Sequence, residues 1–169
     1  MKSLSFLRHA ESEYNYIDNS DFDRPIKKSG LKMTKICAEH LKKKNIRYDL
    51  LFCSPALRTK QTLSYFLSVM NLKTIKVIYD YNLYEGCSEN FLLRVSNLKR
   101  YKDILVVTHE PQILFFKDFF LSETDFWPKI KDLEIATSSV LSINFDINMW
   151  NEINESNAQS FKFLNPILL

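Results

Sequence analysis

Glycine is almost missing from this chain of 169 residues, and its scarcity excludes one way of holding phosphate. The only two glycines are Gly30 and Gly86. Phosphate loops of both common types need several closely spaced glycines, because the backbone itself must wrap around the anion. If this protein handles phosphate, side chains must hold it.

Cysteine is also scarce. The three cysteines, Cys37, Cys53 and Cys87, are odd in number and lack the spacing of metal ligands, which argues against a disulfide framework or a zinc site. Cys37 falls on the apolar face of an expected helix and Cys53 ends an expected strand, so we interpret both as small core residues. No cluster of carboxylates that could hold a metal ion is evident, and we expect neither a metal nor another cofactor.

The chain also lacks a strong excess of charge and long apolar runs. A net charge of +3 is too small to indicate a nucleic-acid partner. The densest basic stretch, residues 42–44 with Arg47, is typical of a solvated helix end. No apolar stretch is long enough to span a bilayer, and Arg8 interrupts the first one too early for a signal peptide. We therefore expect a cytoplasmic protein without a membrane partner, forming one domain over residues 1–169.

What the sequence does contain is an alternation of short apolar runs and helical patterns. This alternation predicts an α/β fold with a mostly parallel sheet. The run 104–107 is apolar throughout, as in a central strand covered on both faces. The last two strands have no helix between them, so they can pair antiparallel. The expected strands are residues 4–7, 50–53, 74–79, 104–107, 140–145 and 161–163, and the expected helices are 31–44, 56–70, 89–99 and 111–120.

Polar side chains follow the expected strands where parallel sheets bind their ligands, at the carboxyl ends. Two of the three histidines, His9 and His109, fall there, whereas His40 falls within a helix and is interpreted as structural. Taken singly, each tip residue has an ordinary surface explanation, but together they predict one pocket. Its expected members are Arg8 and His9, Ser54 and Arg58, Tyr84 and Glu85, and Thr108 and His109.

Two arginines beside two histidines suit the chemistry of a phosphoryl group. At an effective dielectric near 20, each arginine about 4 Å from a unit negative charge contributes about 4 kcal/mol of attraction. The same positive field lowers the pKa of a neighbouring histidine and keeps its imidazole neutral. A neutral imidazole held against phosphorus is a competent nucleophile.

Three segments resemble the motifs of the histidine phosphatase superfamily. They are Arg8-His9-Ala10-Glu11-Ser12, "CSPALRTKQT" (53–62) and "VVTHEP" (106–111), in the order in which the family carries them. The resemblance implies a three-layer α/β/α sandwich whose mostly parallel central sheet carries an antiparallel C-terminal strand. It implies that His9 becomes phosphorylated, that Arg8, Arg58 and His109 surround the phosphoryl group, and that hydrolysis of the phosphohistidine releases inorganic phosphate. Because positioning and charge stabilisation by these side chains need no metal, we expect a metal-independent phosphatase.

The branch of the family is a separate question. The segment from Arg8 to Asn15 also resembles phosphoglycerate mutases, but those enzymes carry long insertions before the second histidine. Here only about fifty residues separate Arg58 from His109, too few for a substantial lid. "FDRPIKKSG" (22–30) and "NLYEG" (82–86) look more like the compact phosphohistidine phosphatases of the SixA type.

Three further residues receive roles from the resemblance. Arg24 is expected near the substrate, Asn15 at the phosphate, and Glu85 as a candidate general acid for the leaving group. Lys27 stands where the SixA pattern has a helix-capping threonine, and we expect Ser29 to cap the helix instead.

Three hypotheses follow. The first is a SixA-like phosphatase that acts on phosphohistidine in a protein through a His9 phosphoenzyme. The second is a phosphomonoesterase or mutase-like enzyme that acts on a small phosphate ester with Glu85 as the acid. The third is a phosphate-binding module without activity, which the nucleophile at position 9 argues against.

Overall fold

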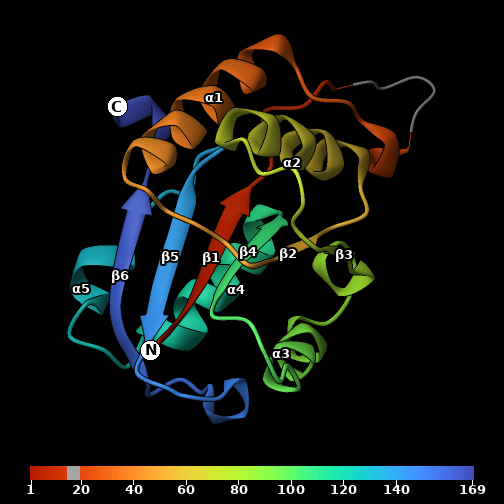
Figure 1. The fold of residues 1–169 in the computed structure, drawn as a ribbon. Coiled ribbons are helices and arrows are strands. Elements are labelled where there is room, and N and C mark those ends of the chain that lie inside the picture. The colour runs from red at the N-terminus through yellow and green to blue at the C-terminus, as the bar shows by residue number, and fades with distance from the viewer. Residues whose placement is uncertain (15–19) are drawn as a thin grey trace.

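A computed structural model describes residues 1–14 and 20–169 and has a six-stranded sheet at its centre (Figure 1). The strand order is β3-β2-β4-β1-β5-β6. The strands are β1 (Lys2–Arg8), β2 (Leu50–Cys53), β3 (Val77–Tyr79), β4 (Asp103–Thr108), β5 (Val140–Phe145) and β6 (Ala158–Leu164).

The sheet has a parallel part and an antiparallel part. Strands β3, β2, β4 and β1 pair in parallel, with β4 between β2 and β1. Strand β5 pairs antiparallel with β1, and β6 pairs antiparallel with β5. The expectation of a mostly parallel sheet with an antiparallel C-terminal strand is confirmed.

Helices cover both faces of the sheet and make it the middle of three layers (Figure 1). The helices are α1 (Lys28–Lys43), α2 (Leu57–Met70), α3 (Ser88–Ser96), α4 (Glu110–Leu121) and α5 (Trp127–Ile130). Helices α1 and α2 pack on one face, and α3, α4 and α5 contribute to the core on the other. In the described part of the chain, every helix is too short or too polar to cross a membrane.

Alternation along the strands divides the apolar residues between two cores. The core under α3 and α4 is rich in phenylalanine: the Phe6 and Phe116 rings stack with centroids 4.6 Å apart, and Phe52 meets Phe91 edge to face. The core under α1 and α2 holds Cys37 and Cys53, both buried and unpaired, as expected. Every residue of β4 from Ile104 to Thr108 is fully buried, which confirms its central place.

Several local expectations need correction. Helix α1 begins at Lys28 with Lys27 as its N-cap, so Ser29 does not cap it; the Ser29 hydroxyl instead donates to the Glu11 carboxylate, 2.7 Å away. Strand β3 is shorter than expected and begins at Val77. The short helix α5 was not predicted, because four residues are too few to show a helical period.

Candidate active site

The parallel pairing of β1 with β4 brings the two tip histidines together. Arg8 is in register with Thr108, so the residues that follow, His9 and His109, leave the sheet side by side. The His9 backbone N–H donates to the Thr108 carbonyl at 3.0 Å, and the two imidazole centroids are 5.1 Å apart. Two histidines separated by a hundred residues of sequence thus share one pocket.

Hydrogen bonds fix a different tautomer in each ring. Nδ1 of His9 lies 2.7 Å from the Ala10 carbonyl oxygen. A carbonyl can only accept, so this nitrogen carries the proton and Nε2 keeps the lone pair. In His109, Nδ1 accepts from Arg58 at 3.2 Å, so Nε2 carries the proton and donates to the Ser54 hydroxyl at 2.8 Å. His9 therefore offers a nucleophilic nitrogen, while His109 helps to hold Arg58.

Both imidazoles are held in the neutral form. Burial, followed by the field of Arg58, lowers the pKa of His109 to about 3. For His9, burial lowers the pKa, the bond to Ala10 opposes this, and Arg58 and Arg8 lower it further, to about 4. At neutral pH the Nε2 lone pair of His9 is available without any deprotonation step.

Arg58 is buried in the first turn of α2, with 5% of its surface exposed. Its guanidinium donates to the Asp21 carbonyl at 2.6 Å and to an Asp21 carboxylate oxygen at 2.9 Å. It also lies over the Tyr84 ring, 5.8 Å from the centroid. Such a buried and multiply bonded guanidinium keeps one orientation, as a group that must hold an anion in place requires.

Asp21 is a pocket residue that the sequence did not indicate. Its carboxylate accepts from Arg58, from Arg24 at 2.8 Å and from the Tyr84 hydroxyl at 3.1 Å. Burial alone would raise the pKa of Asp21, but Arg58, Tyr84 and Arg24 hold it below its ordinary value. The carboxylate takes the kind of contacts that a phosphoryl oxygen would take.

Arg8 has a carboxylate partner of its own. Its guanidinium donates to Glu110, with N···O distances of 3.2 and 3.1 Å, and to the Ile135 carbonyl. Glu110 is the first residue of α4 and directly follows His109. Each pocket arginine is thus bound by a carboxylate from a distant part of the chain.

The pocket encloses about 300 Å³ and includes most of the predicted residues. Glu85 lies in its wall, as a general acid would need to. Arg24 is not part of the lining; it reaches the pocket through its ion pair with Asp21. Asn15, expected at the phosphate, lies outside the described residues. The lining consists of Arg8, His9, Asp21, Arg58, Tyr84, Glu85, His109, Glu110, Pro111 and Gln112.

The loop after β1 is held tightly from two sides. The Ala10 N–H donates to the Thr62 hydroxyl of α2 at 2.9 Å. Gly30, in the first turn of α1, lies so close that a Cβ atom there would be 2.7 Å from the Glu11 carbonyl oxygen. One of the two glycines is therefore needed for close packing beside the candidate nucleophile.

Comparison of the sequence with family models gives a match to the histidine phosphatase superfamily (branch 1) over residues 4–91, more than half of the chain. Comparison with curated proteins gives no match.

Several solved structures have a similar fold. A protein histidine phosphatase SixA complexed with tungstate aligns with a TM-score of 0.78 at 20% identity, covering 98% of both chains. The structure assigned as SixA from Agrobacterium tumefaciens aligns with a TM-score of 0.77 at 20% identity, covering 95% of this chain and 97% of that one. Phosphoglycerate mutase from Bacillus anthracis aligns with a TM-score of 0.61 at 13% identity, covering 84% and 87%. The fold is shared with these proteins, and the family match shows that this chain belongs to the histidine phosphatase superfamily.

Proposed function

We propose that this protein hydrolyses phosphohistidine on a partner protein through a phosphoenzyme formed at His9. The observation that carries the proposal is the His9 ring itself: Nδ1 is protonated and bound to Ala10, and Nε2 is unprotonated beside Arg58 and His109. Membership of the family supports phosphatase chemistry, and the SixA structures support the kind of substrate.

In the first step, Nε2 of His9 attacks phosphorus and the P–N bond to the substrate imidazole breaks. That imidazole keeps the bonding electrons and takes a proton from solvent. Arg58 and Arg8 stabilise the charge on the transferred oxygens by charge-assisted hydrogen bonds. In the second step, water attacks phosphorus, the bond to His9 breaks, and inorganic phosphate leaves. Neither step calls for a metal ion.

The lack of a long insertion beside the pocket favours a protein substrate. Between Arg58 and His109 the chain contains the rest of α2, β3, a 3₁₀ turn at Tyr81–Leu83, α3 and β4. A phosphohistidine on a protein surface must enter with its carrier outside, and a substantial lid would obstruct the carrier. A phosphorylated phosphotransfer domain is therefore the expected partner.

A rapid-quench experiment with a phosphohistidine-bearing phosphotransfer domain tests the proposal. We expect fast turnover in the presence of EDTA, with transient acid-labile, base-stable label on His9. His9→Ala should abolish both turnover and label. Substantial turnover by His9→Ala would rule out the mechanism, and an inert phosphoprotein with rapid cleavage of small esters would rule out the substrate.

The place of Glu85 in the pocket wall favours one alternative, a phosphomonoesterase acting on a small ester. An alkoxide leaving group needs a proton from an acid, whereas a phosphoramidate nitrogen is readily protonated without one. Glu85→Gln should therefore leave phosphohistidine turnover within about twofold of wild type. A loss that grows as the leaving alcohol becomes less acidic would instead establish the alternative.

A further inference from the structure

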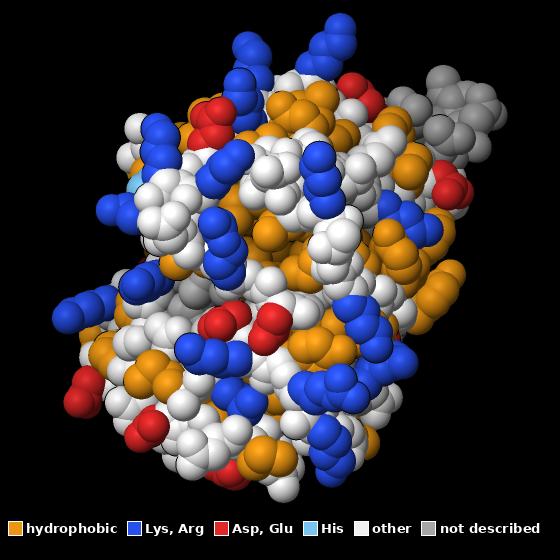
Figure 2. Space-filling model, in the orientation of Figure 1, with side chains coloured by type: hydrophobic (Ala, Val, Ile, Leu, Met, Phe, Trp, Pro, Cys, Tyr) orange, Lys and Arg blue, Asp and Glu red, His pale blue; other side chains and the backbone are white. Residues whose placement is uncertain are grey.

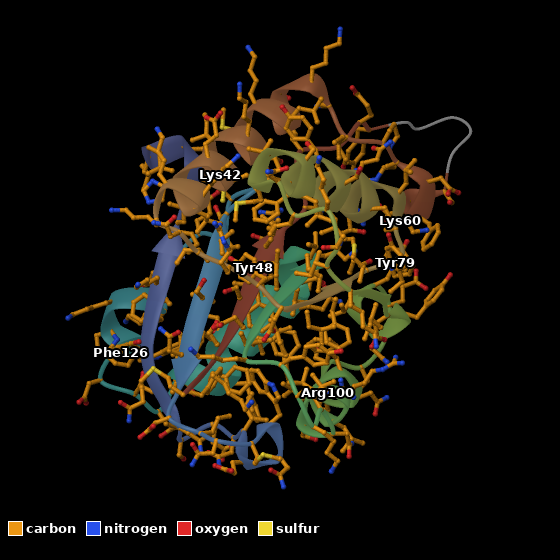
Figure 3. All side chains as sticks on the ribbon, in the orientation of Figure 1. Lys42, Tyr48, Lys60, Tyr79, Arg100 and Phe126 are labelled. Carbon is orange, nitrogen blue, oxygen red and sulfur yellow. The ribbon has the colours of Figure 1, made fainter. Side chains whose placement is uncertain are left out.

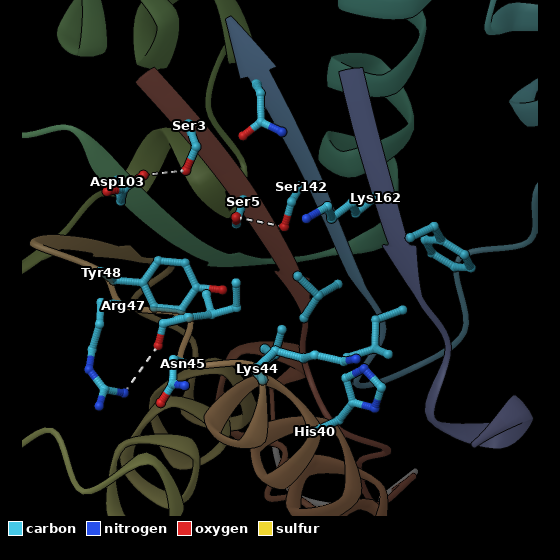
Figure 4. Close-up of a pocket in the computed structure, with 16 residues that line it drawn as sticks. Ser3, Ser5, His40, Lys44, Asn45, Arg47, Tyr48, Asp103, Ser142 and Lys162 are labelled. Atoms are coloured by element: carbon cyan, nitrogen blue, oxygen red, sulfur yellow. Dashed lines mark hydrogen bonds between the residues drawn. The ribbon is translucent and has the colours of Figure 1, made fainter. Parts of the chain in front are cut away.

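A second cavity, of about 800 Å³, lies apart from the strand tips, on the sheet face that α1 and α2 cover in part (Figure 4). We call it the Tyr48 cavity. It is lined by Ser3, Ser5, His40, Leu41, Lys44, Asn45, Ile46, Arg47, Tyr48, Asp103, Val140, Ser142, Asn144, Lys162, Phe163 and Leu164. None of these residues belongs to the pocket of the two histidines.

The floor of the cavity is a polar patch within an otherwise apolar sheet. Alternate residues of β1 and β5 point to this face, and here they are serines and an asparagine instead of aliphatic residues. Ser5 and Ser142 are cross-strand partners whose hydroxyls are 2.8 Å apart, and Ser5 is only 2% exposed. A floor of this kind offers hydrogen bonds to a ligand.

The Tyr48 hydroxyl is the second observation that points to a ligand. Tyr48 is 6% exposed, and within the described residues its hydroxyl makes no hydrogen bond of acceptable geometry, although the Ser5 hydroxyl lies close enough to act on it as a weak hydrogen-bond donor. Burial raises the pKa of Tyr48, so the group remains an O–H donor. In Figure 4 its ring lies between the serine-bearing strands and the end of the helix that carries His40 and Lys44, and Figure 3 places Tyr48 near the middle of the molecule, below α1 and α2. A buried donor without an acceptor is costly, and a bound acceptor would remove that cost.

The rim of the cavity is positive. Lys44 and Arg47 follow the end of α1, where Asn45 turns the chain back with a φ of 55°, and Lys162 comes from β6. Across the described ranges, neither Lys44 nor Lys162 forms an ion pair, and Asp103 is the one carboxylate of the lining. Lysine and arginine side chains are numerous on this face of the molecule (Figure 2). Lys44 and Arg47, from the basic stretch near the end of α1, therefore lie at the edge of a cavity in which they could bind an anion.

We propose that the Tyr48 cavity binds a small organic anion of nucleotide size. The cations would hold its phosphate or carboxylate, the serine and tyrosine hydroxyls its polar groups, and Tyr48, Phe163 and the aliphatic wall its flat apolar body. The volume lies within the range of small-molecule sites. If this sheet face only contacted solvent, burying the Tyr48 hydroxyl without an acceptor would cost stability and bring no gain.

The test uses four probes that separate charge from the flat body: AMP, ribose 5-phosphate, adenosine and inorganic phosphate. Titrations are followed by backbone NMR in the His9→Ala variant, which cannot turn over the probes. We expect AMP to bind with a dissociation constant below about 1 mM and to shift the amides of Ser3, Ser5 and Ser142. Ribose 5-phosphate and adenosine should bind at least about fivefold more weakly, and phosphate should shift only residues beside His109.

Two variants attribute the binding to the cavity. The double variant Lys44→Gln/Lys162→Gln should weaken the binding of AMP at least about tenfold. The control double variant Lys32→Gln/Lys99→Gln changes two exposed lysines away from the cavity and should leave the binding of AMP unchanged. Tyr48→Phe should weaken the binding of AMP without lowering the melting temperature, since the lost hydroxyl makes no hydrogen bond of acceptable geometry within the described residues. Absence of AMP binding at several millimolar, shifts confined to the His9 pocket, or binding unchanged by the cavity variants would overturn the proposal.

Discussion

Two regions of this molecule carry positive charge in opposite ways. At the strand tips each arginine is already bound by a carboxylate: Arg58 by Asp21, and Arg8 by Glu110. Around the Tyr48 cavity, Lys44 and Lys162 extend from the surface without such partners among the described residues. A guanidinium paired with a carboxylate keeps a fixed direction but attracts anions less strongly. An unpaired ammonium has no fixed direction but keeps its full attraction for anions. The first arrangement suits a reaction that depends on position, and the second suits the capture of a ligand.

The largest effect that this comparison predicts comes from removing the buried arginine. If the proposed function holds, Arg58→Ala should lower kcat/KM for phosphohistidine by about a thousandfold, because the transferred phosphoryl group would lose its fixed donor and His109 would lose the group that it holds. Arg58→Lys should recover little, since an ammonium cannot reproduce the planar fork. Lys60→Ala, an exposed position on the same helix, is the matched control and should change the rate little. An equal loss in both variants would mean that α2, not Arg58, is what matters.

Low pH should destabilise the protein because His9 and His109, at the strand tips, are held in the neutral form. Both histidines have folded-state pKa values well below the ordinary value of about 6.5, so between about pH 6.5 and 4 the unfolded chain binds more protons than the folded one. Their stabilising contribution is complete above pH 6.5 and is lost as the pH falls towards 4. Each histidine should remove about 1.4 kcal/mol from the free energy of unfolding per pH unit in this window.

Urea denaturation at a series of pH values measures this slope. His109→Gln should show a shallower dependence than the wild type, because one of the two titrating groups is gone. An unchanged slope would place the acid sensitivity elsewhere in the molecule.

A smaller effect is expected from weakening the pairing at the strand tips. Asp21→Asn should tighten the binding of inorganic phosphate by about threefold, because the phosphate no longer competes with a carboxylate for Arg58; the gain is modest since the Asp21 side chain is 55% exposed. Asp21 and Asp23 belong to one short 3₁₀ helix, Asp21–Asp23, and Asp23→Asn is the control because the Asp23 carboxylate accepts from Ser20. Weaker binding in Asp21→Asn, measured by calorimetry, would show that Asp21 orients Arg58 instead of competing for it.

The smallest effect concerns the unpaired rim. Lys162→Gln should leave the free energy of unfolding within about 0.5 kcal/mol of the wild type, since the ammonium holds no protein partner in the described structure. Thermal and chemical denaturation check this directly. A loss of several kcal/mol would mean that Lys162 interacts with other protein groups and stabilises the fold, as the paired arginines at the strand tips do.

The strands and their tips could be predicted from the sequence because each depends on a local pattern. The apolar run 50–53 is β2 itself, and the apolar run 104–107 lies within β4. Once the strands are parallel, their carboxyl ends meet at one edge, which places Arg8, His9 and His109 together; Arg58 joins them because α2 begins four residues after β2 ends.

The carboxylates of the pocket could not be predicted in this way. Asp21 is 37 residues from Arg58, and Glu110 is 102 from Arg8, so neither pairing leaves a local trace. The Ser29 prediction failed for the same reason: capping rules consider neighbours in sequence, whereas Glu11, 18 residues earlier, takes the hydroxyl. The Tyr48 cavity was equally hidden, because a serine on a strand looks the same whether it meets water or the floor of a cavity.

The opposite tautomers of His9 and His109 give the molecule a built-in pair of spectroscopic reporters. With the imidazole nitrogens labelled by ¹⁵N, His9 should show a protonated Nδ1 and His109 a protonated Nε2 at neutral pH. Phosphorylation of His9 would change the nitrogen signals of His9 and leave those of His109 unchanged. Displacement of Arg58 would free His109 to change its tautomer and leave the signals of His9 unchanged. One spectrum could thus follow bond formation and pocket rearrangement as separate events in the same molecule.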